Sequence, residues 1–265
     1  MTNNLFSNMM VATARDRTEP AEEGVMTAKP SPRRDCDLPE LTAEAIRDAA
    51  VRLTREKGLD GWSIRQLAKE LKAWPNNISY RVGRRDDAAQ LVVDYVMGEI
   101  DVPEDTGDWK PWFEELFVRT RKVLRRYPGV ARRLAAVGPG LGAANETIHR
   151  GISLLERAGF GDRSAEIYSS LMCNVCAFIA TEDDRDSMAE ERKAKGAQYS
   201  RGAHSKDREV ASLGKVVAPI AKDEAARQRY FDDQFLNLVR ALIAGYSSIA
   251  LGQQEGADRS LGTRS

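Results

Sequence analysis

The feature that most constrains the fold is the spacing of apolar residues, which recur every three to four positions along most of the chain. Ile46, Ala49, Ala50 and Leu53 form one such stripe, with charged residues on the opposite face. No segment shows the strict alternation of apolar and polar residues that is typical of a half-buried strand. Because hydrophobic residues make up 42% of the chain, a buried core can form. The pattern therefore predicts an all-α protein.

Changes in composition divide the chain into segments. The first segment is rich in proline and small polar residues, which predicts a disordered arm, whereas the next two have helical periodicity. Within the third segment, one stretch is dominated by charged residues, glycine and serine, and we expect it to be flexible or partly helical. The predicted segments are an arm over 1–40, a helical domain over 41–101, a larger helical domain over 102–252 with a charged insertion over 182–222, and a disordered tail over 253–265.

Several function classes lack their usual sequence signals. There is no apolar run long enough to span a bilayer and no signal-peptide core, so we expect a cytoplasmic protein with no membrane partner. Cys173 and Cys176 form a C-x-x-C inside an apolar helix without a second cysteine pair, which indicates buried core cysteines rather than a metal or redox site. The glycines from Gly138 to Gly142 lack the ending of a phosphate-binding loop. We therefore expect no catalytic residues, no metal and no cofactor.

The stretch that begins at Ser63 predicts two short helices joined by a tight turn. Ser63 and Gln66 have the spacing of a capping box, and Pro75 suits the first position of the second short helix. A longer helix precedes them, and we expect it to start after Thr42 and to end at Gly58 in a left-handed conformation. Two short helices set between longer ones form a helix-turn-helix, whose second helix enters the DNA major groove.

The second short helix has one apolar and one polar face. Ile78 and Val82 lie one turn apart and are expected to face the core, which leaves Asn76, Asn77 and Tyr80 outside. Asparagine can hydrogen-bond adenine edges, and tyrosine commonly reaches phosphate. The surrounding residues carry a local excess of basic over acidic side chains, as a DNA footprint would. The alternative left open by spacing alone is an ordinary helical hairpin with a solvated, charged face.

The residues from Thr42 to Asp101 also resemble the DNA-binding domain of the TetR family of transcriptional regulators. The shared order is a helix, Glu-Lys-Gly, an aromatic residue plus Ser, Ile-Arg-Gln-Leu-Ala, a recognition helix, Val-Gly, a basic residue and an acidic pair, within AIRDAAVRLTREKGLDGWSIRQLAKELKAWPNNISYRVGRRDDAAQLVVD. More weakly, GPGLGAANETIHRGISLLERAGF and YFDDQFLNLVRALIAGY are similar to the family's regulatory domain and last helix. The resemblance implies an all-helical homodimer that binds a double-stranded DNA operator and is released by a small ligand in its C-terminal domain.

The resemblance and the helix geometry together select the residues expected at DNA. Ser79 departs from the family pattern, which has tyrosine there, and Tyr80 is turned about 100° away along the helix. The phosphate contact is therefore either lost or taken over by Ser79 or Arg81, and Ala73 also replaces a larger aliphatic residue. The predicted DNA-binding residues, within the helix-turn-helix over 63–82 and its flank, are Ser63, Arg65, Trp74, Pro75, Asn76, Asn77, Ser79, Tyr80, Arg81, Arg84 and Arg85.

The C-terminal helices lead to two further predictions. Aromatic residues at helical spacing either line a ligand cavity or pack as plain core. The candidate pocket residues are Trp109, Trp112, Phe113, Phe117, His149, Tyr168, Met172 and Phe178. The last helix is apolar along two adjoining stripes, so it needs two packing partners, and the second partner is either another copy of the chain or its own bundle. The candidate dimer seam consists of Phe231, Phe235, Leu238, Leu242 and Ile249, beside a stripe of Leu236, Val239, Ile243, Tyr246 and Ala250.

These observations predict a sequence-specific DNA-binding transcriptional regulator, specifically a repressor that a small-molecule effector releases from its operator. The alternative is an all-α small-molecule-binding protein or enzyme that uses a cavity in the C-terminal domain. Because the chain shows no recognisable nucleophile–base pair or metal cluster, the regulator is the favoured reading and the protein is expected not to be an enzyme.

Overall fold

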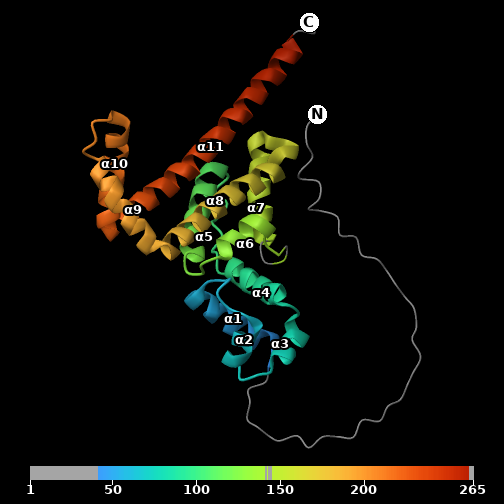
Figure 1. Ribbon diagram of the computed structural model, residues 1–265. Helices are drawn as coiled ribbons and strands as arrows, with labels where there is room; N and C mark the ends of the chain where they lie inside the picture. Colours follow the sequence, from blue (N-terminus) through green and yellow to red (C-terminus); the bar gives the residue numbers. More distant parts are fainter. Residues whose placement is uncertain (1–40, 141, 143–144, 263–265) are drawn as a thin grey trace, which may run out of the picture. The chain divides into compact units, whose positions relative to one another are not determined.

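The chain is described by a computed structural model over residues 41–140, 142 and 145–262, without the side chains of 145, 221–222 and 250–262 (Figure 1). In this part of the chain every regular element is a helix, which confirms the all-α prediction. The predicted arm over residues 1–40 lies outside the described residues. None of the described helices combines the length and apolar character needed to cross a lipid bilayer.

The first four helices are α1 (Ala43–Lys57), α2 (Ile64–Glu70), α3 (Pro75–Val82) and α4 (Arg85–Gly98). Their predicted caps are confirmed, since Thr42 accepts a hydrogen bond from the Ala45 amide at 3.1 Å and Ser63 and Gln66 form a capping box. Gly58 ends α1 with a positive φ of 79°, but its ψ of 161° lies outside the left-handed helical region that was predicted.

The next four helices are α5 (Trp109–Leu124), α6 (Val130–Val137), α7 (Asn145–Leu155) and α8 (Ser164–Ser187). A π-helical turn (Glu156–Phe160) and a 3₁₀ turn (Gly161–Arg163) connect α7 to α8. The sequence did not predict α6, because it is short and lies between two turn glycines. Its buried residues nevertheless pack on α8, so that α6 helps to fix the loop that precedes it.

The charged stretch over 182–222 is helical and belongs to the end of α8, α9 (Ala189–Gly202) and α10 (Arg208–Lys222). Figure 1 shows α9 and α10 side by side as a hairpin, and the two helices pack closely. A Cβ at Gly214 would lie 2.3 Å from the Ala203 amide nitrogen, so only glycine permits this approach. Helices therefore occupy most of the stretch for which the sequence predicted a flexible or partly helical insertion.

The last helix, α11, runs from Glu224 to Gly262 and packs against α5, α8 and α10. It continues past residue 252, so the prediction of a disordered tail is wrong for 253–262, and 263–265 lie outside the described residues. Helices α1 to α8 and α11 contribute to one hydrophobic core, to which α9 and α10 add no described residue, and all of them belong to one compact unit. The division of this unit into two domains near residue 101 stays a prediction.

Candidate nucleic-acid interface

A buried tryptophan stabilises the helix-turn-helix. Trp62 lies in the turn between α1 and α2, is 4% exposed, and donates its indole N–H to the Thr54 hydroxyl at 2.9 Å. Thr54 in turn donates to the Ala50 carbonyl of α1 at 2.8 Å. Because this chain of hydrogen bonds is buried, it fixes the angle at which α2 leaves α1.

The turn between α2 and α3 is tight and slightly strained. The Ala73 amide donates to the Ala68 carbonyl at 2.9 Å, which closes the turn after the last residues of α2. Lys72 reaches this geometry with a φ of 50°, a left-handed value that costs a non-glycine residue about 1 kcal/mol. Pro75 begins α3 at its first position, as predicted.

Helix α3 buries one side chain fully, packs Val82 partly against the core and presents most of the others to solvent. Ile78 is fully buried, whereas Asn76, Asn77 and Ser79 are exposed. Tyr80 is 92% exposed, which is unusual for so large an aromatic residue and leaves its ring free to meet a partner. The outward positions predicted from the helical period are confirmed, and their role at DNA stays a prediction.

The flanks of this surface contain the other predicted DNA-binding residues. Trp74 is 78% exposed at the start of α3, and Pro75 beside it is half-buried. The remaining exposed members are Ser63 at the N-cap of α2, Arg65 of α2, Arg81 of α3 and Arg84 before α4. The structure therefore brings hydroxyl, amide, aromatic and guanidinium groups onto the surface of one helix-turn-helix.

Arg85 differs from the other basic residues of this surface. Its guanidinium donates to the Leu59 carbonyl, lies 3.3 Å from the Asp60 carboxylate, and stacks 4.9 Å above the Trp62 ring. The side chain is only 27% exposed. Arg85 therefore braces the turn between α1 and α2, whereas Arg84 is the more accessible of the two arginines for a phosphate.

The same turn is joined to the C-terminal helices through main-chain atoms. The Leu59 amide donates to the Pro128 carbonyl at 2.7 Å, in the loop between α5 and α6. The next residue, Gly129, has a φ of 88° and donates its amide to the Asp183 carboxylate of α8 at 3.0 Å. Burial raises the pKa of Asp183 above its ordinary value, although the Gly129 amide and Arg125 oppose the shift. Sequence spacing did not reveal this joint because its partners are far apart along the chain.

The predicted pocket aromatics form a packed cluster. Trp109, Trp112, Phe113, Phe117 and Tyr168 are buried and meet in edge-on or tilted pairs. Met172 and Phe178 are half-buried against this core, whereas His149 is exposed. None of these residues lines the cavity of 580 Å³ that the described residues form between α5 and α11. A ligand site within the aromatic cluster stays a prediction.

The stripes on α11 were assigned partly wrongly. Phe235 was expected in a dimer seam, but it is 1% exposed and packs on Phe178 within its own chain. Val239 and Ile243 of the neighbouring stripe are buried on the same face, because residues four apart drift slowly around a helix of 3.6 residues per turn. The core-facing side thus lies between the two predicted stripes. Phe231, Leu238, Leu242 and Ile249 keep partial or full exposure.

The two cysteines of α8 also differ from expectation. Cys176 is buried, and desolvation raises the pKa of its thiol to about 12, so that it behaves as a core residue. Cys173 is exposed, which corrects the prediction that both are buried. Residues three positions apart point about 60° away from each other around a helix, so Cys173 can lie outside the buried face that contains Cys176. No cluster of metal-ligating side chains occurs among the residues that the structure describes.

An all-helical chain with a braced helix-turn-helix and an outward polar recognition helix has the architecture of a helix-turn-helix transcriptional regulator. More particularly, the fold is that of the TetR family, which confirms the resemblance found in the sequence. ActR of Streptomyces coelicolor, a TetR family protein solved in complex with (S)-DNPA, is 25% identical with a TM-score of 0.60 and is covered over 98% of its length by 77% of this chain. TetR from Acinetobacter baumannii AYE is 20% identical with a TM-score of 0.58, covering 80% of this chain and 99% of that one, which shows the fold alone.

The curated relatives are likewise named as helix-turn-helix transcriptional regulators. An HTH-type transcriptional regulator from Saccharopolyspora erythraea is 26% identical over 204 residues, which cover 72% of this chain and 85% of that protein. The HTH-type transcriptional repressor DrrR1 from Streptomyces coeruleorubidus is 30% identical over 92 residues, or 34% of each chain. No family model matches the chain.

Proposed function

We propose that this protein is a sequence-specific DNA-binding transcriptional repressor that reads its operator with α3. The observation that carries the proposal is the outward face of α3, where Asn76 and Asn77 are exposed beside Tyr80 while Ile78 anchors the helix from within. Paired asparagines at the start of a recognition helix suit adenine edges in the major groove, and the tyrosine and arginine side chains suit phosphates. The relatives named as helix-turn-helix regulators support the same reading.

The repressor would act as a homodimer. Two recognition helices about 34–36 Å apart would enter successive major grooves of a palindromic operator. On α11, Leu238 and Ile249 remain outside the chain's own core and would supply part of the contact between copies. Figure 1 shows α11 as a long helix, which offers an extended surface for such pairing.

A small-molecule effector bound among the C-terminal helices would release the DNA. ActR has been solved both with (S)-DNPA and with actinorhodin, so a protein of the same fold accepts organic molecules. The joint from Asp183 through Gly129 and Pro128 to Leu59 offers a physical route, because a displacement of α8 would move the turn that carries α2. The loss of DNA affinity is limited by the ligand's differential affinity for the two states.

The test measures fluorescence anisotropy of labelled DNA taken from just upstream of the protein's own gene, against a scrambled duplex of equal length. Replacing Asn76 and Asn77 by alanine should raise the Kd for specific DNA at least about tenfold, since each bidentate hydrogen-bond contact between a side chain and a base contributes roughly 1–3 kcal/mol. Asn174→Ala, at an exposed position on α8, is the matched control. Equal losses on both duplexes would contradict base reading by α3.

A further inference from the structure

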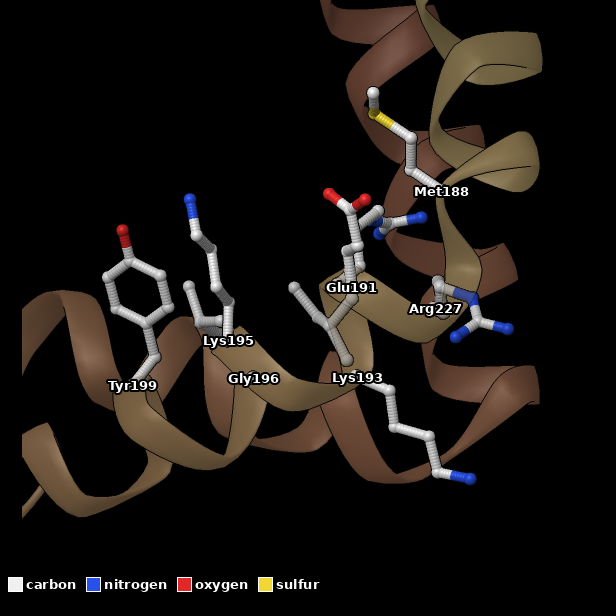
Figure 2. Close-up of a pocket in the computed structure, with 10 residues that line it drawn as sticks. Met188, Glu191, Lys193, Lys195, Gly196, Tyr199 and Arg227 are labelled. Atoms are coloured by element: carbon white, nitrogen blue, oxygen red, sulfur yellow. The ribbon is translucent and has the colours of Figure 1, made fainter.

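A second cavity lies away from the recognition helix and from the aromatic cluster. It has a volume of 280 Å³ and is enclosed by α9, the second half of α10 and the first turns of α11. Figure 2 shows Tyr199, Lys195 and Glu191 directed to one side of α9, while Lys193 turns the other way. The volume is close to the lower end of small-molecule sites in proteins, about 300–1,000 Å³.

The walls of this cavity are partly apolar. Met188 and Tyr199 line it from α9 and its start, and Val217 and Ile220 line it from α10. Met188 is 54% exposed and Tyr199 45% exposed, so their apolar surfaces are available to an occupant. Gly196, which lies between them on α9, also borders the cavity. The cavity can therefore take the hydrocarbon or ring portion of a small molecule.

The charges around the cavity are mostly positive. Arg192, Lys195 and Arg227 line it together with one carboxylate, that of Glu191. Arg227 forms an ion pair with Glu224, but Arg192 has no ion pair with any carboxylate among the described side chains. Its guanidinium is instead oriented by a hydrogen bond of 3.2 Å to the Arg185 carbonyl.

Arg192 lies beside a second guanidinium, with which it shares the Phe231 ring. Its guanidinium and that of Arg185 both approach the Phe231 ring, at 5.5 and 4.7 Å from the centroid. Burial, with the like charges of Arg227 and Arg185, lowers the pKa of Arg192 below its ordinary value. A pre-oriented cation that its surroundings destabilise is one that an anionic ligand would stabilise on binding.

We infer that the cavity between α9, α10 and α11 is a binding site for a small organic anion with an apolar body, whose acidic group pairs with Arg192 and Lys195. The apolar walls receive the body, and the guanidinium supplies a planar donor pair suited to a carboxylate, sulfonate or phosphate. This inference goes beyond the proposed function, because it assigns a ligand class to one cavity whether or not the bound anion releases DNA, and its test contains no DNA.

The test titrates the full-length chain with 8-anilinonaphthalene-1-sulfonate and, separately, with N-phenyl-1-naphthylamine, which has nearly the same rings without the acidic group. Calorimetry and fluorescence should show one saturable sulfonate site per chain. Arg192→Met should weaken sulfonate binding at least tenfold and leave the neutral compound within twofold. Arg201→Met, which removes an exposed arginine of α9 outside the cavity, should leave both unchanged.

A second variant keeps the test informative if Arg192→Met does not fold. Lys195→Met changes an exposed residue of the same cavity and should also weaken the sulfonate selectively. Circular dichroism of each variant should match that of the unaltered protein, which shows that the fold is kept. The inference is overturned if no saturable site is found, if Arg192→Met and Lys195→Met bind the sulfonate as tightly as the unaltered protein, or if Arg201→Met loses as much.

Discussion

The ion pair between Arg121 and Glu182 provides a sharp test of how burial sets the strength of a charge contact. The two side chains are 14% and 4% exposed, and they pair through two hydrogen bonds, Nε–Oε2 at 2.9 Å and Nη2–Oε1 at 2.7 Å. The same guanidinium also meets Asp232 at 2.7 Å, but that carboxylate is 45% exposed. One arginine therefore has a buried partner, which it meets through two hydrogen bonds, and a half-exposed partner, which it meets through one at a similar distance.

The expected costs differ because the two carboxylates differ in burial. Breaking a buried pair from one side costs about 3–5 kcal/mol, and we expect the lower end, about 3 kcal/mol, for Glu182→Ala because Asp232 remains. Asp232→Ala removes a partner that water can replace, so its cost should be about 1 kcal/mol or less. The double change Arg121→Met with Glu182→Leu should cost less than Glu182→Ala alone, because no uncompensated charge stays buried.

The assay is equilibrium unfolding in urea, followed by circular dichroism at one fixed protein concentration, because any self-association would make stability depend on concentration. The free energies of unfolding are compared only between variants whose unfolding free energy depends equally steeply on urea concentration. If Glu182→Ala and Asp232→Ala cost the same within about 0.5 kcal/mol, burial does not decide the strength of these contacts, and the reasoning is refuted.

Three further predictions concern other parts of the chain. Lys72→Gly should raise the free energy of unfolding by about 0.5 kcal/mol, because relief of the left-handed φ outweighs the added entropy of the unfolded chain. Lys69→Gly, inside α2, should instead lower the free energy of unfolding by about 1 kcal/mol. Chemical denaturation of the two variants compares these values. Burial alone would raise the pKa of Glu99. Hydrogen bonds from two tyrosine hydroxyls and the charges of two arginines outweigh burial and hold this pKa below its ordinary value. The stability that Glu99 supplies is thus fully present above its unfolded pKa of about 4.3 and is lost as the pH falls through the lower folded value, so Glu99→Gln should flatten this acid limb in melts recorded across that range; an unchanged limb would exclude the role. Leu238→Asp should give monomers by sedimentation, while Leu213→Asp, at an exposed apolar site on α10, should not; a folded dimer with Asp at 238 would place the contact elsewhere.

The N-terminal helices were predictable because their signals are local. A capping box, a proline at the first helical position and a single inward apolar residue each act within one turn of helix. The outward face of α3 followed directly from the position of Ile78. These features do not depend on what the rest of the chain does, so sequence alone could place them.

Features that depend on distant partners were not predictable in the same way. The bracing role of Arg85 requires the Leu59 carbonyl and the Trp62 ring to be in place, and a phosphate clamp was an equally good reading of an isolated arginine. Phe235 was assigned to the wrong partner because a helix with two apolar stripes does not reveal which stripe its own chain covers. The charged hairpin was underestimated because its close packing rests on glycines, which are also typical of loops.

The contact between the Leu59 amide and the Pro128 carbonyl joins only main-chain atoms. Any residue at position 59 other than proline would provide the same donor. A scan that changes side chains alone would therefore leave this one hydrogen bond in place, whereas the Gly129–Asp183 part of the same joint depends on a carboxylate and on a glycine. Deleting the Leu59–Pro128 hydrogen bond takes a change to the backbone itself, such as an ester in place of the Leu59 amide, so this half of the joint stays in place when the side chains around it change.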